Sequence, residues 1–207
     1  MLKKYQDNEH VGMISGDNFV QEKTLVKINP NKDEYYFVRP IYIWGWATWR
    51  RAWSKYDIEM KSWPNFKKQH RLQKIFSSKN VSSFYNDSFE FGYSKRINTW
   101  DVQWFFSCLA NNMLCIIPPR NLVSNIGISG THSISASPFN NMHTEFISVE
   151  NLKHPREMTP NIEIEYALLK DTFVDNFNYR ILLIQILDML KLRKFTRLIY
   201  RKLKLKI

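Results

Sequence analysis

One acidic residue in this 207-residue chain stands beside side chains suited to chemistry on a sugar. Asp101 follows Trp100 and precedes Trp104, so a carboxylate lies close in sequence to two indole rings. A carboxylate can take the proton from a hydroxyl group that acts as a nucleophile, and indole rings can stack on the CH faces of sugars. The pattern therefore predicts a sugar site. The alternative is that Asp101 only caps a helix over 102–110, because aspartate is a favoured N-cap residue.

A polar loop with two glycines follows the apolar stretch after Asp101. It runs from Asn125 to His132 and contains Gly127 and Gly130, which allow the backbone to move. His132 could reach a diphosphate or a metal, or it could be a structural or solvated histidine. Arg120 could bind a phosphate with both guanidinium nitrogens, but an arginine after two prolines is better interpreted as a surface residue.

Four short motifs, taken in order, resemble a known family. They are Ile-Ser-Gly-Asp-Asn at 14–18, Ile-Trp-Gly-Trp-Ala-Thr-Trp at 43–49, Trp-Asp at 100–101, and Asn-Leu-Val-Ser-Asn-Ile-Gly at 121–127 with Thr-His at 131–132. The set resembles bacterial nucleotide-sugar glycosyltransferases of the GT-A type, often described as hemolysin-like proteins. It is more distantly similar to the C-terminal half of N-acetylglucosaminyltransferase I. The resemblance covers the chain from Tyr5 to His132.

The resemblance implies a role for each matching residue. Asp101 would be the general base of an inverting transfer from a nucleotide-sugar to a glycan or lipid-linked acceptor in bacterial surface polysaccharide synthesis. His132 would be a metal ligand. Donor and acceptor contacts would come from Asp17, Asn18, Trp100, Trp104, Asn125 and Gly127. Asp17 and Asn18 alone would otherwise indicate an ordinary Asx turn.

The resemblance also implies an acidic metal-binding motif that this chain lacks. Enzymes of this type hold Mn²⁺ or Mg²⁺ on an acidic motif, Glu-Asp-Asp or Asp-x-Asp, which is absent here. The chain thus resembles the C-terminal half only, and the donor half is expected as a separate chain or an upstream segment. We expect little or no transfer by these residues alone, and an exposed apolar sheet edge where the missing strands would pair.

The helices and strands expected around these residues indicate an α/β fold with a small mixed sheet and a helical tail. By the resemblance, this would be the C-terminal portion of a GT-A fold. The expected units are an acceptor-side half over 1–132, a linker over 133–160 and a helical tail over 161–207. Strands are expected over 11–16, 34–38 and 114–117. Helices are expected at the end of 1–8, over 43–54 with Trp46, Trp49 and Trp53 on one face, as short pieces in 56–94, and over 102–110 and 163–175. Loops are expected over 20–32 and 80–83.

The charge of +11 is unevenly distributed, since +8 lies between Arg180 and Ile207. A nearly balanced body argues against nucleic-acid binding, and the basic amphipathic tail predicts contact with an anionic membrane surface. The sequence shows neither a signal peptide nor an apolar run of membrane-spanning length. Cys108 and Cys115 are expected to be buried free thiols. The expected location is cytoplasmic, with peripheral attachment at the inner face of the membrane.

Two other functions fit the same sequence. One is a non-catalytic glycan-binding or accessory subunit, which would bind glycans without affinity for nucleotides. The other is a membrane-surface adaptor, whose function would be lost on substitution of the tail alone.

Overall fold

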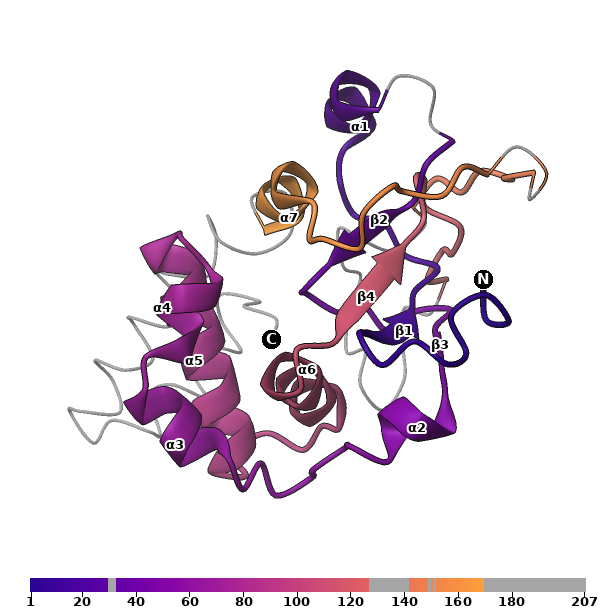
Figure 1. Ribbon diagram of the computed structural model, residues 1–207. Helices are drawn as coiled ribbons and strands as arrows, with labels where there is room; N and C mark the ends of the chain where they lie inside the picture. Colours follow the sequence, from indigo (N-terminus) through magenta and orange to yellow (C-terminus); the bar gives the residue numbers. More distant parts are fainter. Residues whose placement is uncertain (30–32, 127–141, 149, 151, 170–207) are drawn as a thin grey trace.

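The computed structural model of this protein describes residues 1–29, 33–126, 142–148, 150 and 152–169. A small sheet lies among helices, and one group of helices stands to its side (Figure 1). The strands are β1 Val11–Ile14, β2 Tyr36–Val38, β3 Ala47–Thr48 and β4 Leu114–Ile117. The helices are α1 Glu22–Ile28, α2 Arg50–Trp53, α3 Trp63–Lys68, α4 Arg71–Ile75, α5 Lys79–Tyr93, α6 Asp101–Ala110 and α7 Ile162–Leu169. The predicted combination of helices with a small mixed sheet is confirmed.

The sheet has four strands in the order β2-β4-β1-β3. The two central strands, β1 and β4, are parallel, and each has an antiparallel outer neighbour. All four residues of β4 are buried, as expected of a strand covered on both faces. Pro118 and Pro119 follow it and lack the N–H groups that a longer ladder would need. The strand predicted over 114–117 is therefore confirmed with its bounds.

The two faces of the sheet are covered differently. One face packs on α6, α1 and α7, and its core contains Met13, Val38, Cys115, Ile117, Leu25, Trp104, Cys108 and Leu168. The other face is covered by the N-terminal segment and by Leu152, around Tyr5, Val11, Tyr35, Phe37, Leu114 and Ile116. Both cysteines are buried and free, as predicted.

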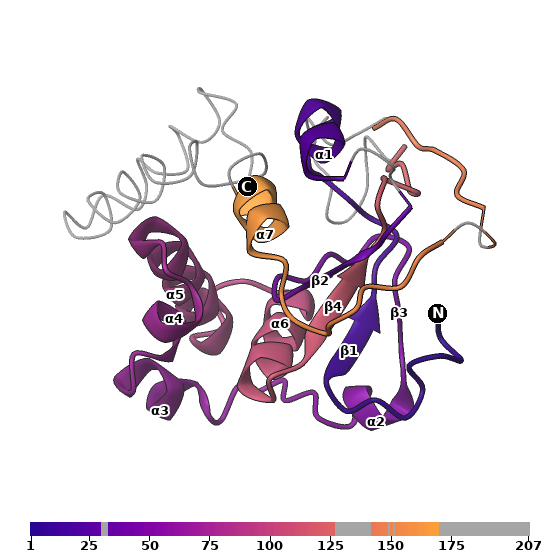
Figure 2. The same cartoon turned by 45° about the horizontal axis from the view of Figure 1, so that its top comes forward.

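A second core joins the helices α3, α4 and α5 to α6. Figure 2 shows these three helices grouped beside α6, on the side of that helix away from β1 and β3. Phe105 and Phe106 of α6 contact Phe89 of α5, at ring-centroid distances of 5.3 and 5.6 Å. Trp63 of α3 meets Phe106 edge to face. Helix α6 is therefore shared between the sheet and the helical group, and it fixes their relative position.

Helix α6 begins and ends close to where the sequence predicts. It covers 101–110, against the predicted 102–110. At its end, Asn112 has a left-handed backbone with φ 54°, and the N–H groups of Met113 and Asn112 bond to the carbonyls of Cys108 and Leu109. This is a Schellman ending, in which asparagine takes the place that glycine usually occupies.

The outer edge of β2 is covered, so the exposed apolar edge that the sequence predicts does not lie at this strand. All three β2 residues are buried, and the Phe37 carbonyl accepts a hydrogen bond of 2.8 Å from the Asn161 N–H. Glu165 of α7 binds the Arg39 side chain through both carboxylate oxygens and accepts a 2.6 Å bond from the Arg39 N–H. The segment before α7 and α7 itself therefore close this edge.

Three other predicted elements are wrong. The range 20–32 contains α1, because Leu25 packs into the core against the sheet. The range 80–83 belongs to α5, whose N-cap Ser78 accepts a bond from the Val81 N–H. The end of a helix predicted in 1–8 is a series of turns.

The helix predicted over 43–54 is also wrong for most of its length. Only α2 is helical there. Residues 47–48 instead form β3, which pairs with β1 at Met13 and Ile14. Pairing with a strand distant in sequence has therefore replaced the helical spacing of the tryptophans.

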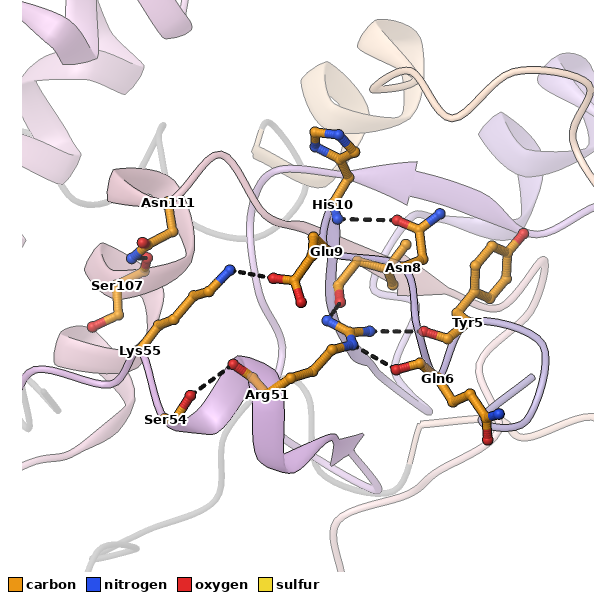
Figure 3. Close-up of polar contacts among 11 residues, drawn as sticks. Tyr5, Gln6, Asn8, Glu9, His10, Arg51, Ser54, Lys55, Ser107 and Asn111 are labelled. Atoms are coloured by element: carbon orange, nitrogen blue, oxygen red, sulfur yellow. Dashed lines mark hydrogen bonds and ion pairs between the residues drawn. The ribbon is translucent and has the colours of Figure 1, made fainter.

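Arg51 of α2 ties the N-terminal segment to the body (Figure 3). Its guanidinium donates hydrogen bonds of 2.7, 2.6 and 2.9 Å to the carbonyls of Tyr5, Gln6 and Val11. It also lies 4.6 Å from the ring centroid of Trp49. Nearby, Lys55 and Glu9 form an exposed ion pair at 2.5 Å, also drawn in Figure 3. These contacts hold the segment that covers one face of the sheet.

Within the described residues, no helix has the length and apolar character needed to cross a membrane. The predicted linker over 133–160 is described only in part, and the basic tail from Arg180 onward lies outside the described residues. The predicted membrane contact of the tail therefore stays a prediction.

Candidate functional site

Three of the sequence motifs meet at the end of β1. The Gly16 N–H bonds to the Trp44 carbonyl at 3.3 Å, and the Leu122 N–H bonds to the Gly16 carbonyl at 2.9 Å. Val123 packs so closely on Gly45 that a Cβ there would lie 2.4 Å from Val123 Cγ2. Gly45 also has φ +59°, a left-handed conformation that side chains disfavour. The motifs at 14–18, 43–49 and 121–127 therefore form one structural unit.

Asn18 holds this unit together by hydrogen bonds on both ends of its side-chain amide. It is 1% exposed. Its side-chain nitrogen donates to the Pro118 carbonyl at 2.8 Å, and its side-chain oxygen accepts from the Val20 N–H at 3.1 Å. Its own N–H bonds to the side-chain oxygen of Asn121. Because both ends of the amide are engaged, Asn18 is a scaffold for the neighbouring Asp17.

Asp17 is a buried carboxylate with one satisfied oxygen. Its Oδ2 accepts a hydrogen bond of 2.8 Å from the Trp44 N–H. Its Oδ1 is buried and has no hydrogen-bond partner within the described part of the chain. Burial raises the pKa of Asp17 to about 7, against the opposing effect of the Trp44 bond. This carboxyl group can therefore hold or release a proton near neutral pH.

Asp101 sits at the first position of α6. Trp100 is the N-cap, and its side chain makes no capping bond. Asp101 Oδ1 accepts from the Val102 N–H at 2.9 Å and from the Thr99 hydroxyl. Asp101 is therefore a residue of the helix and not its N-cap, so the capping alternative is wrong in this form, although the carboxylate does bond at the helix start. It also has a second role, because it lines a pocket.

Asp17 and Asp101 line the same pocket, which has a volume of about 260 Å³. Helix α5, helix α6 and the segment before Gly45 form its walls. The lining residues are Asp17, Phe19, Ile41, Tyr42, Ile43, Trp44, Phe84, Tyr85, Ser88, Asp101, Val102 and Phe105. We call this the two-carboxylate pocket. Its lining is mainly apolar and aromatic, with a few polar groups, which is typical of small-molecule sites.

Trp100, the residue before Asp101, belongs to a cluster of aromatic rings. Trp46 stacks on Trp100 with ring centroids 5.3 Å apart, and Trp53 stacks on Tyr56 at 4.7 Å. Trp53 and Trp100 are each 39% exposed. We call this partly exposed pair of rings the platform; Trp100 directly precedes Asp101, which lines the pocket.

Trp104 and Trp49 have other places than the sequence suggests. Trp104 is fully buried and lies 5.0 Å from the Trp53 ring centroid. It therefore supports the exposed rings from beneath and does not itself form the surface. Trp49 belongs to the core on the other face of the sheet, away from Trp46 and Trp53. The three tryptophans predicted on one helical face thus split into two groups.

A larger pocket of about 510 Å³ is lined by Asn18 and shares Phe19 with the two-carboxylate pocket. Arg120, His143 and Glu145 contribute its polar lining, with Phe19 and Leu25 among the apolar residues. Arg120 forms an ion pair with Glu145. The Arg120 side chain is only 19% exposed, so it is not the open surface residue that its place after two prolines predicts.

The predicted lid residues are only partly placed. Asn125 is half-buried, whereas Gly127 and His132 lie outside the described residues. Among the residues that the structure describes, no group of three or more His, Cys, Asp or Glu side chains could hold a metal ion. The described residues thus do not offer the ligand set that the resemblance implies for Mn²⁺ or Mg²⁺, and we derive no step through a metal.

Sequence reasoning missed the wall that α5 contributes to the pocket. Phe84, Tyr85 and Ser88 come from this helix, in a range where scattered aromatics showed no clear period. The signal that could have found it is the helix start at Ser78, followed by apolar residues at 81, 85 and 89 with helical spacing.

Comparisons with family models, curated proteins and solved structures find no match to this chain. The chemistry of the two-carboxylate pocket therefore has to be inferred from its own residues and from the motifs that form it.

Proposed function

We propose that this chain carries the acceptor-binding side of a GT-A nucleotide-sugar glycosyltransferase that acts on a glycan or lipid-linked acceptor. The observation that carries the proposal is the pocket shared by Asp17 and Asp101, together with the partly exposed ring of Trp100, the residue before Asp101. Sugars present CH faces that stack on aromatic rings and hydroxyl groups that bond to carboxylates. A pocket with both features suits an acceptor sugar.

In the proposed reaction, Asp101 is the general base. Thr99 and the Val102 N–H hold its Oδ1, which orients Oδ2 to take the proton of an acceptor hydroxyl. As that proton leaves, the acceptor oxygen forms a bond to the anomeric carbon of the donor sugar. The bond from this carbon to the nucleoside diphosphate breaks with inversion.

The test compares two variants of this protein. Transfer from UDP- and GDP-sugars to methyl glycosides would be followed by mass spectrometry. It would be measured for the chain alone and for the chain co-expressed with the reading frame upstream of its gene. In the active form, Asp101→Asn should lower transfer about 100- to 10,000-fold, because a general base typically contributes that much. Asp7→Asn, at an exposed position, should keep the wild-type rate.

Folding and acceptor binding need separate measurement. Circular dichroism and saturation-transfer NMR with methyl glycosides should give the same results for Asp101→Asn and the wild type. Turnover above about a third of wild type in this variant would leave Asp101 only its bonds at the start of α6.

The second candidate function is a non-catalytic glycan-binding subunit. The exposed pair Trp53 and Trp100 favours it, because an aromatic platform binds sugars whether or not chemistry follows. Glycoside binding with no nucleotide-sugar binding and no transfer in either form would support this candidate over the enzyme.

A further inference from the structure

The two-carboxylate pocket has a chemical asymmetry that points to the class of sugar it would take. This inference rests on the proposed function, since it assumes that the pocket binds an acceptor sugar. Asp101, the first residue of α6, is half-buried, whereas Asp17 is 1% exposed. The two acids therefore offer a ligand different partners.

Asp17 has one hydrogen-bonding position that the described chain leaves unused. Trp44 fixes Oδ2, and Oδ1 is buried without a partner among the described residues. A buried polar atom without a partner costs about 1–3 kcal/mol. A ligand atom that bonds to this oxygen would remove that cost, so the position favours a ligand with a matching group.

The surroundings of Asp17 favour its neutral form. The other ionisable groups around it are acids or weak acids: Asp101, Tyr42 and Tyr85 line the same pocket, and the thiol of Cys115 lies close enough to be influenced by Asp17. None of the described residues that line the pocket is Lys, Arg or His. With no cation to stabilise a carboxylate, burial dominates and raises the pKa of Asp17 to about 7. Below neutral pH, Asp17 is therefore mainly a carboxylic acid with an O–H group to donate.

The rest of the pocket is suited to a small apolar group beside that donor. Phe19, Ile41, Ile43, Phe84 and Phe105 are among its lining residues. An acetamido group combines a strong acceptor, its carbonyl oxygen, with a methyl group. Sugar hydroxyl groups in the same place would lose their hydrogen bonds to water and would gain none from these apolar side chains.

We propose that the two-carboxylate pocket is specific for an N-acetylhexosamine acceptor, whose acetamido carbonyl accepts a hydrogen bond from the neutral carboxylic acid of Asp17. The acetamido methyl group packs on the apolar lining, and the sugar ring extends toward Asp101 and the platform at Trp100. The pocket volume of about 260 Å³ lies just below the range of about 300–1,000 Å³ for drug-sized ligands. This volume suits one sugar unit.

The experiment measures binding of methyl N-acetylglucosaminide and methyl glucoside to the full chain by NMR titration at pH 6 and pH 8.5. At pH 6 the acetamido sugar should bind at least about 10-fold more tightly, because a site built for a polar group rejects analogues that lack it. For a group with a pKa of about 7, the protonated fraction falls about 30-fold between these pH values. Affinity for the acetamido sugar should fall by up to that factor.

Three variants separate Asp17 from other titrating groups. Asp17→Asn keeps an acceptor for the Trp44 N–H and supplies a permanent N–H donor, so its affinity should be high and the same at both pH values. Asp17→Leu should lose the preference for the acetamido sugar. Asp101→Asn should keep the full pH dependence. Circular dichroism of each variant establishes that it is folded, and a Leu variant that fails to fold leaves the decision to the Asn variant.

The outcomes distinguish this inference from the function on which it rests. Equal affinity for the two glycosides, or a pH dependence that persists in Asp17→Asn, would overturn the acetamido specificity and leave the acceptor pocket standing. Failure of the wild type to bind any methyl glycoside at millimolar concentration would overturn both.

Discussion

Arg51 and Asp17 are ionisable side chains in two regions of this protein, and they differ in how fully the protein satisfies their hydrogen bonds. Arg51 meets three backbone carbonyls of the N-terminal segment, so its hydrogen bonds hold that segment to the body. Asp17 has one oxygen on the Trp44 N–H and the other without a partner in the described chain. The first side chain completes the fold, and the second leaves one bonding position unused in a residue that lines a pocket.

The hydrogen-bond partners of a polar group thus indicate whether its role is structural or functional. A polar group whose bonds are all made inside the protein contributes to stability and has nothing left for a ligand. A buried group with an unused position lowers stability and persists where something else gains from it. Asn18 belongs with Arg51 in this respect, although it is the direct neighbour of Asp17 and part of the same motif.

Among the variants that test this comparison, Arg51→Met is expected to have the largest effect. It leaves the carbonyls of Tyr5, Gln6 and Val11 without their charged donor. We expect a loss of about 2–3 kcal/mol in the free energy of unfolding, measured by urea titration. Arg50→Met, at an exposed neighbouring position, is the control and should change little. Altered sugar affinity in folded Arg51→Met would show that the two regions are not independent.

A smaller and opposite effect is expected from Asp17→Asn. Because the pKa of Asp17 is raised from 3.8 to about 7 in the folded protein, the unfolded chain releases this proton at lower pH than the folded chain. The wild type therefore loses stability as the pH rises from about 4 to about 7. The variant has no such loss, so it should be more stable than wild type by about 1–2 kcal/mol at pH 8.

The measurement is urea unfolding of both proteins at pH 5 and pH 8. The advantage of Asp17→Asn should grow between the two pH values. An advantage that is the same at both, or a variant less stable at pH 8, would show that Asp17 is not held neutral by burial.

Trp100→Ala should have a still smaller effect, confined to ligand binding. The variant removes one exposed ring of the platform and its stacking on Trp46. Aromatic contacts of this kind contribute about 0.5–1.5 kcal/mol, so sugar affinity should fall about 2- to 10-fold in NMR titration. Trp100→Phe is the matched control and should recover part of the loss. An unchanged affinity would restrict the site to the pocket itself.

The smallest effect is expected from Lys55→Met. Its ion pair with Glu9 is exposed and belongs to the same region as Arg51. The bond to Lys55 lowers the pKa of Glu9, but water screens such pairs effectively. The urea midpoint should match wild type within experimental error. A clear loss would mean that the region depends on this pair as well as on the Arg51 bonds.

Predictions from sequence succeeded where local chemistry decides the structure. Helix α6 and strand β4 have nearly the predicted bounds, because Asn111 and Asn112 end the helix and two prolines end the strand. They failed where a distant partner decides. The tryptophan spacing over 46–53 favours a helix, yet pairing of Ala47 and Thr48 with β1 places them in the sheet.

The candidate site divides in the same way. The order of residues singled out Trp100 and Asp101, as a carboxylate beside indoles, whereas Asp17 and Asn18 were singled out only by the family resemblance. The tertiary structure decided that Asn18 is fully bonded, that Trp104 is buried, and that Asp17 and Asp101 share one pocket. The pKa of Asp17 was equally beyond the sequence, since burial by distant segments sets it and the residue type does not.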